Sequence, residues 1–332
     1  MTLTLDHKKG MVRLIPQPGG LLRIEVIPIG ALKPTKKWTT AYPPELVRAL
    51  LDAKGPLFLC DEIRRDEDPC YTAALLQKSV LAYFDDQALN GKRVLDFGCG
   101  SGASSMVLKR MAPLAQIVGV ERSPGLLEIA RLRARHYGFR DIRFLQSPSD
   151  DQLPPDLEKF DLVLLNAVFE HLLPSERKTL VPMLWDTLKP GGLILITETP
   201  FRWFPIEMHT TGLPMINYLP DKIALTVARM FSSRVSQGES WQSLLRRGIR
   251  GATAAEVLGI LCKHDSRARM AKPGRGIRSC HQVWLEAVSE RKLSLPMSFA
   301  INSARKLTAA TGLGMSPYLC LAIKKEHGTP YA

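Results

Sequence analysis

The sequence predicts an α/β protein built on a doubly wound, mostly parallel sheet. From residue 92 to residue 198, apolar segments suited to strands alternate with amphipathic segments suited to helices, which is the pattern of a parallel sheet covered on both faces. Within this region Phe160–Asn166 is almost wholly apolar, as a central buried strand should be. A glycine-rich turn at residues 98–102 follows the first strand and leads directly into a helix.

The overall composition is that of an ordinary soluble globular protein. The 332 residues are 45% hydrophobic and 23% charged, which allows one large domain or two. The six cysteines form no C-x-x-C pair, which disfavours a zinc cage and indicates free thiols in a reducing compartment. Because the N-terminus lacks a signal-peptide pattern and no apolar run reaches the length of a membrane helix, we expect a cytoplasmic protein.

The net charge of +13 is concentrated in the second part of the chain. Residues 201–332 carry 19 basic and 8 acidic side chains, which gives +11. Such a surface suits phosphate groups, anionic lipid or nucleic acid, and it equally suits a solvated face that keeps the protein in solution. The positive charge therefore indicates which ligands could bind near this segment, but it does not indicate which reaction the protein catalyses.

The first 68 residues are predicted to form an N-terminal extension that covers the core. Residues 11–15 and 21–27 have strand character and flank a Pro/Gly-rich turn, which predicts a hairpin. Residues 35–44 are expected to be irregular, and a short helix is expected to start at Pro44. We interpret the charged stretch 61–68 as a solvated loop, after which residues 69–84 predict an amphipathic helix.

The segment from Val94 to Ala103 predicts a strand, a glycine turn and the start of a helix that runs to Met111. This arrangement lets backbone approach a ligand closely and points unpaired helix-start N–H groups at it. It therefore indicates a nucleotide-type cofactor site. The spacing Gly98-x-Gly100-x-x-Ala103 also satisfies the relaxed dinucleotide fingerprint, so that a dehydrogenase stays open at this point.

The strands that follow place further side chains at the same edge of the sheet. Residues 117–121 predict the second strand, and Glu121 stands 19 residues past Gly102, where such folds place a carboxylate for the ribose hydroxyls. Ser123 is an N-cap with proline after it. Residues 142–146 predict the third strand. Ser175 is expected to cap the helix after the fourth strand, and Lys189-Pro190-Gly191-Gly192 to turn into the fifth strand, residues 193–198.

Taken together, Asp96-x-Gly98-x-Gly100-x-Gly102, Glu170-His171 and Lys189-Pro190-Gly191-Gly192 resemble the motifs of class I S-adenosylmethionine-dependent methyltransferases of the type 11-like group. The resemblance covers about residues 70–200 and implies a Rossmann-like sheet with S-adenosyl-L-methionine as cofactor. Where related enzymes place an acid next to the adenine, this chain has Pro148, so that role passes to Ser149 or Asp150. The predicted cofactor contacts are Asp96, at the amino-acid end of the cofactor, Gly98, Gly100, Gly102, Glu121, Ser149, Asp150 and Asn166.

Residues 69–332 are predicted to form a core, a lid insertion and a terminal strand. Residues 69–200 form the predicted cofactor-binding core, and residues 201–312 a largely helical lid insertion with helices at 222–231, 241–246, 254–262 and 297–309. Residues 313–332 contain a strand-like stretch, 317–324, which in this type of sheet is the terminal antiparallel strand that returns to the core.

His171 and His209 are the predicted catalytic residues. The sulfonium cofactor already activates its methyl group, so the enzyme has to orient the acceptor, and a general base assists where the acceptor is a hydroxyl. His171 follows the fourth strand and His209 the fifth, at the edge where ligands of such sheets bind. The alternative is a structural role for each histidine.

A divalent metal is a second alternative for these side chains. The ubiquinone-biosynthesis O-methyltransferases, which this chain resembles around the cofactor motifs, carry a Glu-x-x-Glu-His arrangement that binds a divalent ion in some members. Here Ala167 replaces the first acid. Glu207 and His209 would have to restore the ligands, which makes Glu170, His171, Glu207 and His209 the candidate set. Because Glu170 can equally pair with an arginine while His171 packs beneath the loop, we predict no metal.

The leading functional hypothesis is O-methylation of a small molecule, a sugar or a lipid-linked glycan, with peripheral membrane contact compatible with the basic segment. An RNA methyltransferase is the first alternative, although Asn166-Ala167-Val168-Phe169 lacks the prolines of a tetrad that methylates exocyclic base nitrogens. The second alternative is a cofactor-binding protein without catalysis.

Overall fold

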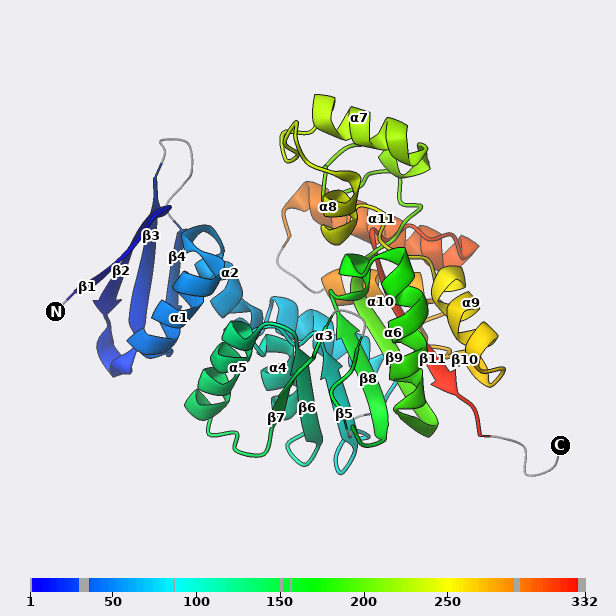
Figure 1. The fold of residues 1–332 in the computed structure, drawn as a ribbon, viewed down its shortest axis with the longest axis horizontal. Helices are drawn as coiled ribbons and strands as arrows, with labels where there is room; N and C mark the ends of the chain where they lie inside the picture. Colours follow the sequence, from blue (N-terminus) through cyan, green and yellow to red (C-terminus); the bar gives the residue numbers. More distant parts are fainter. Residues whose placement is uncertain are drawn as a thin grey trace.

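The computed structural model describes residues 2–29, 36–85, 87–149, 152–155, 157–289 and 293–327. Within these residues the chain forms two sheets, a small antiparallel one at the N-terminal end and a larger, mostly parallel one (Figure 1). Asp150, a predicted adenine contact, lies outside the described residues.

The N-terminal module is an antiparallel meander covered by two helices. Its strands β1 (Leu3–His7), β2 (Gly10–Pro16), β3 (Leu22–Pro28) and β4 (Lys36–Thr40) pair in chain order, which confirms the predicted hairpin. Helices α1 (Pro44–Lys54) and α2 (Pro56–Glu67) share an apolar core with this sheet.

Two predictions for this module are wrong. Residues 36–40 form a strand because their backbone pairs with β3, although the sequence there has no strand alternation. Residues 61–67 belong to helix α2, where a solvated loop was expected. The helix forms because Leu59 and Ile63 pack into the core of the module, while the acids Glu62 and Asp66 on the same helix are buried against Arg133.

The main sheet has the strand order β10-β11-β9-β8-β5-β6-β7. Its parallel strands are β5 (Arg93–Phe97), β6 (Gln116–Glu121), β7 (Arg143–Gln146), β8 (Phe160–Asn166) and β9 (Leu188–Pro200). Strand β11 (Tyr318–Lys325) runs antiparallel to β9, as expected for the terminal strand. The doubly wound, Rossmann-like fold class is confirmed. The sequence did not predict the three-residue strand β10 (Ala268–Met270) at the edge.

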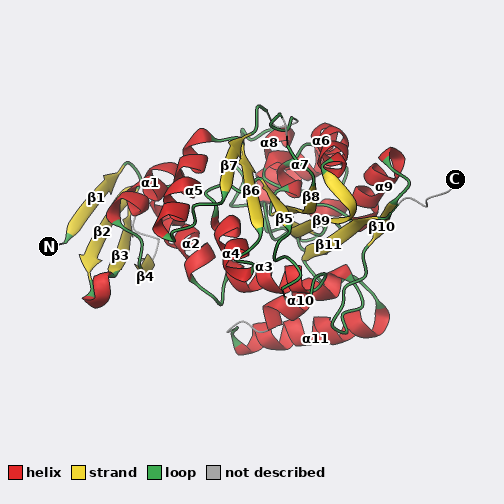
Figure 2. Cartoon of the chain, turned by 90° about the horizontal axis from the view of Figure 1, so that it is seen from below, coloured by secondary structure: helices red, strands yellow, loops and turns green. Residues whose placement is uncertain are grey.

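Each face of the main sheet carries its own apolar cluster, because side chains alternate along a strand. In β8, Leu162 and Leu164 face α3 (Thr72–Leu81), α4 (Ala103–Met111) and α10 (Cys280–Ser289). Val163 and Leu165 face α6 (Pro174–Asp186) and α9 (Ala254–His264). Figure 2 shows α3 and α10, with α11 (Leu295–Thr311), on one side of the sheet and α6 and α9 on the other.

Of the two predicted N-cap residues, Ser123 caps its helix and Ser175 does not. Helix α5 (Pro124–His136) begins after Ser123, whose hydroxyl accepts the backbone N–H of Leu126. Helix α6 begins at Pro174, and its cap is Leu173 where Ser175 was expected. The Glu176 carboxylate accepts the Leu173 N–H at 2.8 Å, and this bond fixes the helix start two residues before the predicted cap.

Residues 201–250 form a small unit beside the sheet's C-terminal edge. Helices α7 (Asp221–Phe231) and α8 (Trp241–Arg246), with the short 3-10 helix Ile216–Tyr218, share a separate apolar core around Ile216, Ala224 and Leu244. The later α9 and β10 pack on the main sheet instead, and α10 was not predicted. The domain boundaries of the sequence analysis remain predictions. Among the described residues, no helix is both long and apolar enough to cross a bilayer.

Candidate active site

A cavity of about 470 Å³ lies at the C-terminal ends of the parallel strands. Its wall combines the turn after β5, the end of β6 and the end of β8 with residues of the 201–250 unit. Seven of the predicted site residues line it, namely Gly98, Gly100, Glu121, Ser149, Asn166, His171 and His209. The predicted cofactor turn and the two predicted catalytic histidines therefore face one space.

The glycines of the turn serve different contacts. A side chain at Gly98 would place its Cβ 2.6 Å from Val168, and one at Gly102 would place it 2.8 Å from Cβ of Ala130 on α5. Gly100 has nothing within 4 Å of its Cβ position and faces the cavity. Gly102 thus allows close packing of the turn on α5, whereas Gly100 leaves room for a ligand.

Asp96 lies behind the turn, and it is absent from the residues that line the cavity. Its buried Oδ2 accepts hydrogen bonds from the hydroxyls of Ser104 and Ser105 on α4, at 2.7 and 2.6 Å. Burial raises the pKa of Asp96 to about 6. The carboxyl group therefore ties the turn to the helix that follows it, and its predicted contact with the cofactor stays a prediction.

Glu121 connects the end of β6 to the turn. Its carboxylate accepts the backbone N–H of Gly100 at 3.2 Å and that of Ser123 at 2.8 Å. Across the cavity, the Asn166 side-chain oxygen accepts the Thr197 hydroxyl at 2.7 Å, which orients the amide at the end of β8. Glu121 is thus held by main-chain N–H groups of two turns, and Asn166 by the neighbouring strand β9, before any ligand binds.

The N-terminal module supplies a wall that the sequence analysis missed. Lys54, Glu62 and Arg65 of this module line the cavity, and Thr72 at the start of α3 lines it as well. Glu62 hydrogen-bonds the Ser101 hydroxyl in the glycine turn. Burial alone would raise the pKa of Glu62, but the guanidinium groups of Arg133 and Arg65 outweigh it and hold the pKa below its usual value. The one available signal was the spacing of Glu62 and Asp66, four residues apart on one helix face.

Arg133 fastens this wall to the turn. Its guanidinium is fully buried on α5 and donates to the Ser101 carbonyl at 3.1 Å, to the Ser101 hydroxyl at 2.7 Å and to the Glu62 carbonyl at 2.6 Å. Because one side chain bonds both partners, the position of α2 and the shape of the glycine turn are coupled.

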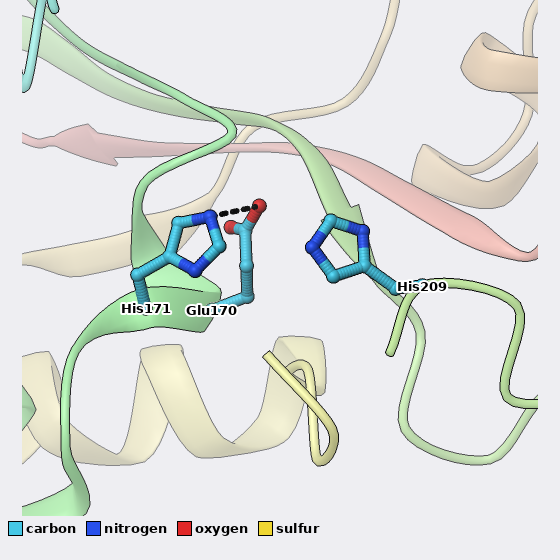
Figure 3. Close-up of side chains that lie close together, drawn as sticks. All are labelled: Glu170, His171 and His209. Carbon is cyan, nitrogen blue, oxygen red and sulfur yellow. Dashed lines mark ion pairs between the residues drawn. The ribbon is translucent and has the colours of Figure 1, made fainter. Parts of the chain in front are cut away.

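Glu170, His171 and His209 form a cluster whose two histidines line the cavity, whereas Glu170 is buried behind them (Figure 3). Glu170 and His171 belong to the 3-10 helix Phe169–His171 that follows β8, and His209 comes from the loop after β9. One potential ligand atom from each residue lies within 4.8 Å of the other two. The Glu170 Oε1 and His171 Nε2 atoms are 3.7 Å apart.

Hydrogen bonds outside the cluster hold two of these side chains. Thr199 donates to Oε2 of Glu170 at 2.9 Å, and Nδ1 of His171 lies 2.8 Å from the Arg246 carbonyl. A carbonyl only accepts, so Nδ1 carries the proton and Nε2 is the basic nitrogen of a neutral His171. Oε1 of Glu170 is buried and has no hydrogen-bond partner among the described residues.

Burial governs the protonation of the whole cluster. It raises the pKa of Glu170 to about 8, lowers the pKa of His171, and lowers the pKa of His209 to about 4 with a contribution from His171. At neutral pH both imidazoles are therefore neutral, and Glu170 mostly keeps its proton. The cluster can accept a proton through an imidazole, or it can bind a cation that replaces the proton of Glu170.

The fourth metal candidate, Glu207, does not join the cluster. Its buried carboxylate accepts the backbone N–H groups of His209, Thr210 and Thr211 at 2.6 to 2.9 Å, together with the Thr211 hydroxyl. Glu207 shapes the loop that presents His209. The predicted pairing of Glu170 with an arginine is not made by Arg177, which directs its side chain to Glu256 and to the main-chain carbonyls of Leu172 and Glu170.

Residues 88–248 match a family model described as "Methyltransferase domain". The chain is 27% identical to a carboxy-S-adenosyl-L-methionine synthase of Photorhabdus laumondii over 136 residues, 37% of this chain and 53% of that protein. It is 30% identical to a ubiquinone biosynthesis O-methyltransferase of Chelativorans sp. over 161 residues, 42% of this chain and 61% of that protein. The matched part thus spans about half the length of these relatives.

Among solved structures, the S-adenosylmethionine-dependent methyltransferase SibL in its apo form superposes with a TM-score of 0.45 at 16% identity, over 85% of this chain and 62% of that one. The family model thus covers a little under half of the chain, and the motifs, the fold and the sequence relatives agree in their similarity to class I S-adenosylmethionine-dependent methyltransferases.

Proposed function

We propose that this protein transfers a methyl group from S-adenosyl-L-methionine to an oxygen atom of a small-molecule, sugar or lipid-linked acceptor. The observation that carries the proposal is the shared cavity, which is lined by the glycine turn, Glu121, His171 and His209, with Glu170 buried beside the two histidines. A cofactor on the turn would present its methyl group toward a base in the same space.

In this proposal the first half of the cavity holds the cofactor. The Glu121 carboxylate accepts the two ribose hydroxyls, and the turn at Gly98 and Gly100 passes beneath the ligand. Ser149 and Asn166 also line the cavity and would supply polar contacts to the cofactor. Asp96 acts from behind as a positioning residue, because its bonds to α4 fix the turn.

The second half orients the acceptor and receives its proton. Holding an acceptor oxygen in line with the methyl–sulfur bond accounts for roughly 7–11 kcal/mol of a barrier. Neutral His209 takes the hydroxyl proton, which adds roughly 10²–10⁴-fold. His171 stays fixed by the Arg246 carbonyl, with its basic nitrogen toward the protonated Glu170.

A divalent ion is the alternative use of the same three side chains. The residues present fit an ion in two respects, namely the buried, unpartnered Oε1 of Glu170 and the outer hydrogen bonds to Glu170 and His171. Two imidazoles with one carboxylate suit Mn²⁺ or Zn²⁺ better than Mg²⁺. When bound, such an ion lowers the pKa of a coordinated acceptor hydroxyl.

The test is methyl transfer from a labelled donor to an acceptor panel and to cell extracts, followed by identification of the labelled product. Glu121→Ala is expected to weaken cofactor binding about 10- to 100-fold in calorimetry, through loss of charge-assisted hydrogen bonds. His209→Asn should bind cofactor normally and lose most of the transfer rate. Unaltered cofactor affinity in Glu121→Ala, or full turnover in His209→Asn, would contradict these roles.

Chelation separates the two uses of the cluster. The proposal with His209 as base expects unchanged turnover after exhaustive dialysis against a chelator and no bound transition metal in elemental analysis. Loss of turnover that Mn²⁺ or Zn²⁺ restores would favour the metal instead. Neither result tests cofactor binding, which the Glu121→Ala variant tests separately.

A further inference from the structure

Helix α7 exposes three large apolar side chains and buries two alanines. Ile223, Met230 and Phe231 are 52%, 65% and 67% exposed, whereas Ala224 and Ala228 are fully buried in the core of the 201–250 unit. At about 100° per residue, Ile223, Met230 and Phe231 lie on one face of the helix, while Leu225 and Val227 are half-buried against the core of the unit. The three exposed residues are here called the α7 apolar face, and exposed side chains of this size are unusual on a helix of a globular protein.

The α7 apolar face lies at the periphery of the molecule. In Figure 1, α7 is the outermost element at the top, with α8 beneath it and no described element above it. The loop before it adds Met208, 47% exposed, which stays close because Arg234, three residues past α7, donates to the Met208 carbonyl at 2.8 Å.

The charges around this face are cationic. Residues 201–250 carry seven Lys or Arg and three Asp or Glu. Glu207 is engaged by main-chain N–H groups, and Asp221 and Glu239 pair with Arg250 and Arg247, so that these two arginines add no excess positive charge. Lys222 borders the apolar residues on α7, and Arg234 follows the helix, both exposed. A surface of exposed apolar side chains bordered by cations complements an anionic bilayer.

We infer that the α7 apolar face docks on the surface of an anionic lipid bilayer, with Met230 and Phe231 inserted at the headgroup level. A second copy of the chain fits less well, because a stable dimer buries about 800 Å² per partner, and a helix of 11 residues spans only about 16 Å. Insertion into lipid needs only a few apolar side chains and nearby cations.

Docking of this kind brings the cavity to the bilayer. Met208 is exposed beside α7, and the next residue, His209, lines the cavity. A lipid-linked acceptor would then reach the base without leaving the membrane surface. This link to the acceptor rests on the proposed function, whereas the docking itself is independent of it.

The test measures co-sedimentation of the full chain with vesicles, without cofactor or acceptor. Vesicles that mix phosphatidylglycerol with phosphatidylcholine are expected to bind the protein, and added salt should weaken the binding. The double variant Met230→Asp with Phe231→Asp should lose at least about tenfold in affinity. The matched control, Leu114→Asp, changes an exposed leucine that is 73% accessible in the turn before β6 and should bind like the wild type.

Several outcomes overturn the inference. They are absence of vesicle binding by the wild type, equal binding by the double variant, and equal loss in the Leu114→Asp control. Concentration-dependent dimerisation that the double variant abolishes would assign the face to a second copy instead. Circular dichroism verifies that each variant is folded, and Lys222→Glu provides a second variant that tests the charge with the apolar face intact. These measurements do not involve methyl transfer. Their outcome is therefore independent of whether the proposed function is correct.

Discussion

Arg133→Leu is expected to destabilise the protein and to weaken cofactor binding together. The guanidinium is fully buried and bonds Ser101 in the glycine turn and Glu62 on α2, with Glu62 and Asp66 carboxylates 3.6 and 3.7 Å away. Removing it leaves the buried carboxylates of Glu62 and Asp66 with Arg65 and Arg110 as their remaining cationic partners, and breaking a buried ion pair typically costs about 3–5 kcal/mol. Loss of two hydrogen bonds to the turn should lower the affinity for S-adenosyl-L-methionine about tenfold.

Urea denaturation followed by circular dichroism gives the free energy of unfolding, and calorimetry gives the cofactor affinity. The matched control is Arg135→Leu on the same helix, because Arg135 is exposed and pairs with the exposed Glu128, and surface changes of this kind stay within about 0.5 kcal/mol. If Arg133→Leu unfolds at the same urea concentration as Arg135→Leu, the coupling of the module to the turn is refuted.

The pH dependence gives an independent check on the same pair. The pKa of Glu62 is lowered in the wild type, so its ion pair stabilises the protein above the unfolded pKa, and this stability is lost as the pH falls through the folded pKa. In Arg133→Leu, the Glu62 carboxylate keeps Arg65 but loses Arg133 as a cationic partner, so its protonation costs less stability than in the wild type. The stability gap between variant and wild type should therefore narrow as the pH falls below about 4. A gap that is constant or widens there contradicts the assignment.

The remaining predictions concern the turn and the cluster. Gly102→Ala should lower the free energy of unfolding by about 1–3 kcal/mol, because its Cβ would stand 2.8 Å from Ala130 at a φ of +86°. Gly100→Ala, with open space at a φ of +54°, should lose less, and equal losses in urea titrations would argue against the contact with α5. In metal-free protein, the raised pKa of Glu170 means that the folded state holds a proton that the unfolded chain releases, so stability falls as the pH rises from about 4.5 to about 8. Glu170→Gln should remove that slope in thermal melts, and an unchanged slope would show that another group titrates. Glu207→Ala should lower kcat without changing cofactor affinity, since it frees the loop that presents His209. Normal turnover in this variant would show that the loop holds its shape without the carboxylate.

The sequence by itself determined the features that depend on local backbone chemistry. The turn between β5 and α4 requires glycine where φ is positive, and Ser123 caps α5 with its own side chain. The apolar run of β8 indicates a buried parallel strand, and the position of Glu121 follows from the fixed length of a strand–turn–helix–strand unit. Residues close together in the sequence determine each of these features, so a single sequence is enough to predict them.

Only the tertiary structure decided which distant side chains meet. Glu62 and Arg133 stand 71 residues apart in the sequence. Because they are buried as a pair, the charged stretch that resembles a solvated loop forms part of a helix in the cavity wall. His171 and His209 come from loops after different strands, and the loop held by Glu207 brings them together while Glu207 itself stays apart from them. The backbone pairing of β4 likewise depends on β3. Such contacts arise from packing of the whole chain, since the free energy that buries a charge or orders a loop comes from partners far away in sequence.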